Sequence, residues 1–204
     1  DRPVTYKLVR KEEDVEVYSC TGTPVDCVKL AFHALFQDVK PDLVLAGINH
    51  GDNASSNVHY SGTMAVVIEG CLKAVPSIGF SSCNVDKNAD FSCYESLVCN
   101  LCSIVLERGL PKDVCLNVNF PLSSSSKVKV CKQDWGNWHQ EWERCFRKDG
   151  SQYFWLSGYY ESNEPENEDS DRWALEHGYV AITPVTVDVT AYHFMDDLRN
   201  WIEK

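Results

Sequence analysis

The sequence predicts an α/β protein with a mainly parallel sheet. Apolar runs of strand length alternate along the chain with longer segments of helical periodicity. Strands are expected at 15–18, 43–45, 77–82 and 114–120, and helices at 24–37, 64–74 and 91–108. This alternation, at this spacing, is typical of right-handed β-α-β units. A polar loop at 46–63 joins one buried strand to the next helix, which is the position of the ligand crevice in open α/β sheets.

The first helix has the clearest start signal in the chain. Thr23 is expected to be its N-cap and Pro24 its first residue. Asp26 would stand at the third helical position, where a carboxylate favours the positive end of the helix dipole. A second helix is expected to begin at Ser61, Gly62 and Thr63, directly after the polar loop.

The composition changes after Pro121. Strand-like segments at 127–133 and 151–160 carry or flank many aromatic side chains, among them Trp135, Trp138, Trp142 and Trp155. An isolated hairpin cannot bury so many rings, and a neighbouring subunit is the simplest surface to cover them. A last strand is expected at 178–184 and a terminal helix at 192–203. We therefore expect one domain over 1–204, with a hairpin arm and acidic loop at 122–172, and the last strand and helix at 173–204.

Charge and cysteine content limit the class of function. The formal net charge is −11, which disfavours binding to a nucleic acid polymer but permits a small phosphorylated substrate beside a metal cation. No apolar run approaches the roughly 20 residues of a membrane span. The ten cysteines are expected to be reduced and mostly buried, which favours a cytoplasmic protein. Cys99 and Cys102 form a C-x-x-C pair without a second pair at zinc spacing, so a zinc or redox module is only a rival interpretation.

The polar loop offers neutral oxygen atoms and backbone N–H groups. Asparagine and serine oxygens can complete the shell of Mg²⁺ or Mn²⁺ but usually need carboxylates beside them. Backbone N–H groups at 61–63 suit phosphate oxygens, and Gly62 permits a close approach. The residue types alone equally allow an ordinary N-cap and a set of turn residues. His50 and His59 could serve as general acids or phosphate donors, or simply pack the loop.

Several motifs together resemble the SurE survival-protein family. They extend through most of the chain, and the similarity is weakest at about 122–172. In chain order they are TGTPxD at 21–26, GINxGxN at 47–53, YSGT at 60–63, EG at 69–70, NVNxP at 117–121 and GYVxITP at 178–184. A single one of these motifs would carry little weight, whereas their common order is specific.

The resemblance implies a Rossmann-like three-layer fold and a divalent-metal-dependent phosphatase (Mg²⁺ or Mn²⁺) acting on nucleoside monophosphates as a 5′/3′-nucleotidase. It implies that Asn49 is a metal ligand, and that Asn53, Ser61 and Thr63 act on the phosphate during catalysis. Gly51 and Gly62 would line the substrate pocket with them, while the turn at 21–26 supports the site. It also implies dimers or tetramers formed through the hairpin arm and an exchanged C-terminal segment.

The sequence departs from the family pattern at its start. The family begins with a strand and an Asn-Asp-Asp-Gly turn whose aspartates bind the metal, and a serine in a later loop is a further ligand. No Asp-Asp pair precedes Thr21, and Asp196-Asp197 falls on the terminal helix, where a solvated face is expected. We therefore expect that the sequence omits an N-terminal segment and that this chain alone is inactive. The alternative is a non-catalytic oligomeric protein that keeps the scaffold without its metal centre.

Overall fold

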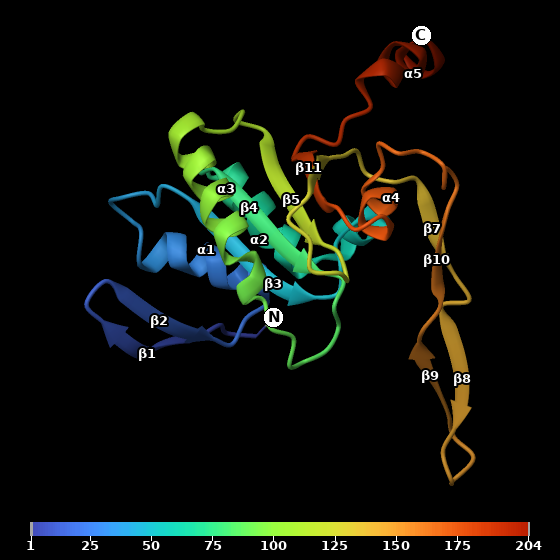
Figure 1. Cartoon of the computed structure of the whole chain (residues 1–204), viewed down its shortest axis with the longest axis horizontal. Helices are drawn as coiled ribbons and strands as arrows, with labels where there is room; N and C mark the ends of the chain where they lie inside the picture. Colours follow the sequence, from blue (N-terminus) through green and yellow to red (C-terminus); the bar gives the residue numbers. More distant parts are fainter. Residues whose placement is uncertain (1, 204) are drawn as a thin grey trace.

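The computed structural model describes residues 2–203, and it contains a five-stranded sheet with helices on both faces (Figure 1). The strand order is β3-β4-β5-β11-β6, in which β3, β4 and β5 are parallel and β11 runs antiparallel to β5. The strands of this sheet are β3 (Val44–His50), β4 (Ser77–Ser82), β5 (Val114–Phe120), β6 (Val128–Val130) and β11 (Val180–Thr186). The predicted α/β class with a mainly parallel sheet is confirmed.

Two helical layers enclose the sheet. The helices are α1 (Pro24–Ala34) and α2 (Gly62–Leu72) on one side and α3 (Glu95–Arg108) on the other, preceded by the short turn η2 (Ser92–Tyr94). Side chains alternate across a strand, so Ile78 and Phe80 of β4 meet the α3 layer. Gly79 of the same strand lies under Met64 and Val67 of α2. Because both faces are covered, every residue of β4 is buried.

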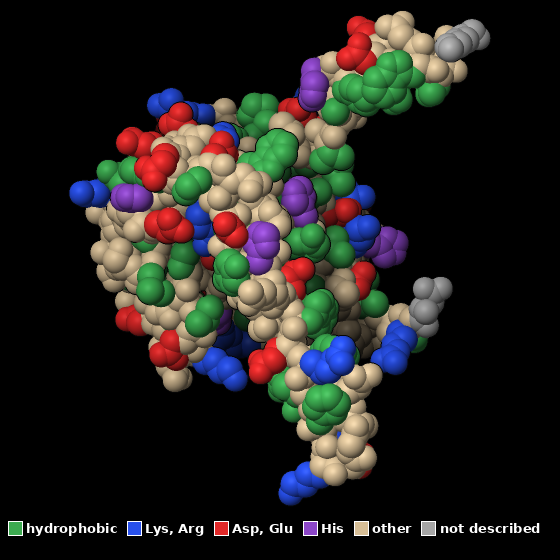
Figure 2. Space-filling model, turned by 90° about the vertical axis from the view of Figure 1, so that its right-hand side faces the viewer, with side chains coloured by type: hydrophobic (Ala, Val, Ile, Leu, Met, Phe, Trp, Pro, Cys, Tyr) green, Lys and Arg blue, Asp and Glu red, His purple; other side chains and the backbone are tan. Residues whose placement is uncertain are grey.

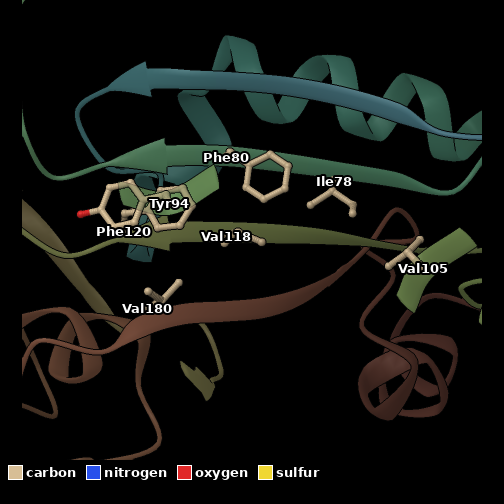
Figure 3. Close-up of a cluster of buried hydrophobic side chains, with 7 residues drawn as sticks. All are labelled: Ile78, Phe80, Tyr94, Val105, Val118, Phe120 and Val180. Atoms are coloured by element: carbon tan, nitrogen blue, oxygen red, sulfur yellow. The ribbon is translucent and has the colours of Figure 1, made fainter. Parts of the chain in front are cut away.

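The core on the α3 side is built from aromatic and branched side chains of β4, β5, β11, η2 and α3 (Figure 3). Tyr94 stacks on Phe120 with their ring centroids 4.0 Å apart. Its hydroxyl donates to the Pro121 carbonyl over 3.2 Å, which satisfies the buried polar atom. The remaining members of this cluster are Ile78, Phe80, Val105, Val118 and Val180.

The start of α1 agrees with the sequence prediction in detail. Thr23 is the N-cap: its side chain accepts from the Asp26 N–H, and the Asp26 carboxylate accepts from the Thr23 N–H at 2.9 Å. These reciprocal bonds form a capping box. The Thr23 hydroxyl and backbone N–H, both donating to the carboxylate, hold the pKa of Asp26 below its usual value. The start of α1 also packs against the start of α2, where Gly62 lies against Pro24.

The N-terminal strands do not join the main sheet. β1 (Tyr6–Glu12) and β2 (Val15–Cys20) form an antiparallel hairpin of their own. The expected strand at 15–18 is therefore real, but its place at the start of the parallel β-α-β series is wrong. Alternation in sequence reveals a strand, whereas the choice of partner depends on tertiary contacts.

An arm of paired strands extends from the body (Figure 1). Its base pairs β7 (Gly136–His139) with β10 (Tyr159–Ser162), and its tip pairs β8 (Trp142–Phe146) with β9 (Gln152–Leu156). The segment expected as a strand at 151–160 is therefore two strands with a break at 157–158. The segment at 127–133 contributes β6 to the main sheet instead of the arm. A short helix, α4 (Asp171–Glu176), follows the acidic loop and was not expected.

The chain ends in the turn η3 (Tyr192–Phe194) and the helix α5 (Met195–Ile202), which projects from the body. Figure 2 looks onto the arm side and shows hydrophobic side chains gathered on this projecting helix. Trp201 is 62 % exposed and Ile202 is 70 % exposed. Within residues 2–203, no helix is both long and apolar enough to cross a membrane.

All ten cysteines carry free thiols. The expectation that most are buried was wrong, because only Cys71, Cys115 and Cys131 are buried. Burial raises the pKa of Cys115 to about 12 and that of Cys131 to about 11, so these thiols stay protonated and unreactive at neutral pH. The other seven thiols are half-buried or exposed. Cys27 lies on α1, and Cys99 and Cys102 on α3, two outer helices in which no cysteine is buried.

We predict that Ile78→Val lowers the free energy of unfolding by about 0.5–1.5 kcal/mol, because it removes a methyl group from a site with no solvent exposure. Ile104→Val, at a position 41 % exposed on α3, is the matched control and should change it by less than about 0.5 kcal/mol. Urea unfolding followed by circular dichroism measures both. Equal effects of the two substitutions would contradict the assigned core.

Candidate functional site

The polar loop at 46–63 lies at the carboxyl edge of the parallel strands. It contains the end of β3, the 3-10 turn η1 (Ser55–Tyr60) and the first residues of α2. Because β3, β4 and β5 are parallel, their carboxyl ends meet at one edge and bring Ser81, Asn117 and Asn119 to the same loop. The sequence prediction of a polar crevice at this edge thus corresponds to a real cluster of side chains.

Asn49 is the centre of this cluster. Its side-chain oxygen accepts three hydrogen bonds: from the Thr63 hydroxyl and the Ser81 hydroxyl, each at 2.8 Å, and from the Asn53 amide at 3.2 Å. Its amide nitrogen donates to the Gly51 carbonyl over 2.7 Å. Both ends of the side chain are therefore held, and the oxygen points at the hydroxyl groups. The structure brings three predicted site residues, Asn49, Asn53 and Thr63, into direct contact.

Two asparagines of β5 hold the backbone of Asn53 in place. Its backbone N–H donates to the Asn119 side chain over 2.7 Å, and its carbonyl accepts from the Asn117 side chain at 2.8 Å. Asn119 in turn donates to Asn117 over 3.0 Å. All three residues are buried, so each of these polar groups needs its partner. The Asn53 amide also donates to the Ser81 hydroxyl.

Ser81, Asn117 and Asn119 received no role from the sequence. Asn117 and Asn119 are two residues apart on a strand, which places both on the same face, and that spacing is a signal that could have located them. Ser81 lies near the end of β4, and no pattern in the sequence distinguishes it from the rest of the strand. Its contact with Asn49 depends on the register between β3 and β4, which the sequence does not reveal.

Ser61 and Gly62 are placed differently from Thr63. The Ser61 hydroxyl accepts from the Met64 N–H at 3.0 Å as the N-cap of α2, and Ser61 lines a separate cavity of about 520 Å³ on the β11 side. A side chain at Gly62 would stand 3.1 Å from Pro24. Ser61 therefore makes no side-chain contact with Asn49 in the hydrogen-bond network. Its predicted place in a phosphate pocket, with that of Gly62, stays a prediction.

Two glycines give the loop its path. Gly47 has φ +107°, and a Cβ atom there would lie 2.0 Å from the Phe80 carbonyl oxygen, so a larger residue cannot be accommodated. Gly51 has φ +88° and forms a bridge with Ser82 at the end of β4. The predicted substrate contact of Gly51 stays a prediction, whereas its conformational role is directly visible.

The two loop histidines make packing contacts. The His50 ring nitrogen lies 3.3 Å from the Asn84 carbonyl oxygen, and its ring centroid is 5.2 Å from that of Phe91. His59 is hydrogen-bonded to Gln133 at 3.2 Å. Of the two roles that the sequence left open, these contacts support the packing role.

A buried carboxylate joins this loop to the arm. Asp171, the first residue of α4, has no solvent exposure and accepts from the Ser55 N–H at 2.9 Å and from the Asp134 N–H at 3.0 Å. Burial raises the pKa of Asp171, while these N–H donors act in the opposite sense. Asp134 is also buried, and accepts from Tyr160 at 2.8 Å and Ser162 at 3.0 Å on β10.

Arg172 adds an ion pair to the same junction. Its guanidinium lies 3.2 Å from the Asp52 carboxylate and 4.8 Å from the centroid of the Tyr160 ring. Both charged side chains are only 17 % exposed, so the pair is screened less than a surface pair. The sequence offered no signal for this junction, because its members are separated by up to 120 positions.

The donor set around Asn49 is neutral. Within residues 2–203, no group of three or more His, Cys, Asp and Glu side chains could hold a metal ion. One amide oxygen fits a hard divalent cation as a single ligand, but Mg²⁺ usually takes one or two carboxylates as well. The described residues around Asn49 therefore do not form a complete metal site.

The fold and its asparagine–hydroxyl cluster define a three-layer α/β protein with a polar site at the carboxyl edge of a parallel sheet. The family model "Survival protein SurE" matches residues 1–140, and the chain belongs to this family. It is 57 % identical over 202 residues to the 5′-nucleotidase SurE of Phocaeicola vulgatus, an alignment covering 98 % of this chain and 78 % of the relative. The corresponding protein of Bacteroides fragilis is 54 % identical over 201 residues, with the same coverage.

A solved structure shows the same architecture. The crystal structure of the SurE protein from Aquifex aeolicus superimposes with a TM-score of 0.81 at 31 % sequence identity. The similarity covers all of this chain and 81 % of that one. The family membership and the fold that the sequence motifs implied are thus confirmed.

We predict that Asp171→Asn lowers the free energy of unfolding by about 1–3 kcal/mol. Its two carboxylate oxygens accept from two buried N–H groups, and an amide has only one oxygen to offer, so one donor loses its partner. Asp169→Asn, at an exposed position of the same loop, is the matched control and should stay within about 0.5 kcal/mol of the wild type.

Urea unfolding gives both values. If Asp171→Asn proved as stable as Asp169→Asn, the carboxylate would not be the tie between the loop and the arm.

Proposed function

We propose that this protein is a hydrolase of phosphoric monoesters that converts nucleoside monophosphates to nucleoside and phosphate, as a 5′/3′-nucleotidase. The observation that carries the proposal is the contact of Asn49 with Thr63, Ser81 and Asn53 at the carboxyl edge of the sheet. Three segments distant in sequence place hydrogen-bonding groups at one point there. Relatives at up to 57 % identity are named 5′-nucleotidase SurE, which supports the same activity for this chain.

Asn53 and Thr63 are proposed to bind the non-bridging oxygens of the phosphate. The Asn53 amide and the Thr63 hydroxyl each donate a hydrogen bond to the Asn49 oxygen. Either group can donate to a phosphate oxygen instead. As the phosphoryl group is transferred to water, such fixed donors stabilise the charge on its equatorial oxygens. The anchoring of Asn53 by Asn117 and Asn119 limits the reorganisation that the reaction requires.

Ser61 and Gly62 are proposed to contribute through the start of α2. The first N–H groups of a helix have no partner within the helix and, with its dipole, favour an anion. The Ser61 side chain satisfies the Met64 N–H, so the N–H groups of Gly62 and Thr63 are the ones proposed for the phosphate. Gly51 is proposed to line the same pocket from the end of β3.

A divalent cation, Mg²⁺ or Mn²⁺, is proposed as the cofactor, with Asn49 as one of its ligands. When bound, the cation would neutralise phosphate charge and polarise the phosphoryl group. The net charge of −11 and the neutral donor set support this proposal, because the described residues around Asn49 offer a phosphate dianion no compensating cationic contact. Asn49 itself would hold its oxygen toward the cation through the bond from its amide to Gly51.

Self-association as a dimer or tetramer is proposed to accompany this activity. The arm exposes large apolar side chains, among them Trp142 at 64 % and Trp155 at 62 %, that a second subunit would cover. The ten free thiols support a reducing, cytoplasmic location.

We predict that the natural protein releases inorganic phosphate from AMP in the presence of Mg²⁺ or Mn²⁺. Asn49→Ala should lower kcat/KM by about 100-fold or more, because the side chain that would hold the metal and align Thr63 is lost. Asn88→Ala, at an exposed loop position, is the matched control and should retain full activity.

Phosphate release is measured colorimetrically, and circular dichroism checks that both variants are folded. Absence of metal-dependent phosphate release by the wild type would refute the proposed function. Unchanged activity of a folded Asn49→Ala variant would remove Asn49 from the site.

A further inference from the structure

A second cavity lies beside η1, the turn that follows Asn53 in the chain. It has a volume of about 620 Å³ and lies between η1 and the arm, with Tyr60 and Trp138 as its aromatic walls. Leu156 adds an apolar contact, while Asn57 and Glu141 contribute polar groups. An aromatic-walled space with a few polar groups is the usual character of a small-molecule site.

The Trp138 wall is fixed in place. Its indole N–H donates to the Asn57 side-chain oxygen over 2.8 Å, and the Asn57 amide donates to the Asp52 carbonyl over 3.3 Å. The Trp138 ring also meets Tyr160 edge-on, with a centroid distance of 6.2 Å. The orientation of the indole is thus set by contacts from both the loop and the arm.

The Tyr60 wall is unusual for its exposure. Its side chain is 84 % exposed, although it ends the same turn whose other large apolar residue, Val58, is buried. Packing therefore does not account for an aromatic ring at this position. The ring stands directly before Ser61, Gly62 and Thr63, the residues proposed to bind the phosphate.

The cavity and the Asn49 cluster share one structural element. The turn η1 connects Asn53, which contacts Asn49, to the start of α2, and its residues Asn57 and Tyr60 face the cavity. A ligand with its phosphate at Thr63 and a flat group on Tyr60 would thus extend along η1 toward the arm. A nucleoside monophosphate has this form, with a phosphate at one end and an aromatic base at the other.

We propose that this cavity is the nucleobase subsite of the enzyme, in which the base stacks on Tyr60 and Trp138. This inference rests on the proposed nucleotidase function, and it adds that the enzyme recognises the nucleobase of its substrate. Every base has an aromatic face, so the stacking itself is tolerant of base identity. The Glu141 carboxylate accepts hydrogen bonds only, and therefore favours bases that present an amino group, such as adenine, guanine and cytosine.

The test compares a substrate that has a base with one that lacks it. Tyr60→Ala should lower kcat/KM for AMP by about 10-fold or more, mainly through KM, because the stacking contact of the base is removed. The same variant should leave kcat/KM for ribose 5-phosphate within about 2-fold of the wild type, since this substrate has no base to lose. Tyr60→Phe, which keeps the ring, should behave like the wild type on both substrates.

Variants at two further positions, 138 and 159, separate stacking from a general effect on the arm. Tyr159→Ala removes a tyrosine from the arm outside this cavity and should leave the AMP-to-ribose-5-phosphate ratio of kcat/KM unchanged. Trp138→Phe keeps an aromatic wall but loses the indole N–H, and should reduce the ratio less than Trp138→Ala. Binding of adenosine, measured by calorimetry, should weaken in Tyr60→Ala in parallel with the kinetics.

Equal losses on AMP and ribose 5-phosphate in Tyr60→Ala would overturn the subsite while leaving the nucleotidase intact. So would a wild-type enzyme that does not discriminate between the two substrates. Failure of the proposed function itself has a different result, namely no phosphate release by the wild type from either substrate.

Discussion

The buried carboxylate of Asp171 connects the parts of this protein that matter for its function. One of its oxygens accepts from the backbone of Ser55 at the start of η1, and the other accepts from the backbone of Asp134 at the base of the arm. A carboxylate in a site without solvent exposure is costly unless both oxygens are hydrogen-bonded, and here both are. The position of the loop that carries Asn53 and Tyr60 is therefore tied to the position of the arm that carries Trp138.

This tie couples the two parts of the proposed substrate site through one segment of the chain. Asn49 and Thr63 belong to the sheet and to α2, whereas Trp138 belongs to the arm. The loop that contains η1 contacts both, through Asn53 just before the turn and Asn57 within it. A displacement of the arm would therefore move one wall of the cavity relative to the predicted phosphate pocket.

The hydrogen-bond cluster at Asn49 is neutral, and this decides what it can do. Amide and hydroxyl groups orient a phosphate and stabilise a changing charge distribution, but they do not neutralise a dianion. In a chain with a net charge of −11, the missing positive charge is the strongest physical argument for a divalent cation in the proposed reaction. The asparagines of β5 beneath the cluster hold it rigid, so that its donors are in place before the substrate binds.

The sequence by itself determined the α/β class, the boundaries of β4 and β5, and the N-cap of α1, because these follow from local periodicity, propensity and short-range hydrogen bonds. Its motifs also contain Asn49, Asn53 and Thr63, which the structure brings into contact and whose functional roles stay predictions. Only the tertiary structure decided that Ser81 and the asparagines of β5 join them, that β6 belongs to the main sheet, and that Asp171 links the loop to the arm. These features depend on strand register and on contacts between residues as many as 116 positions apart, and no local pattern encodes which distant partner a polar side chain will meet.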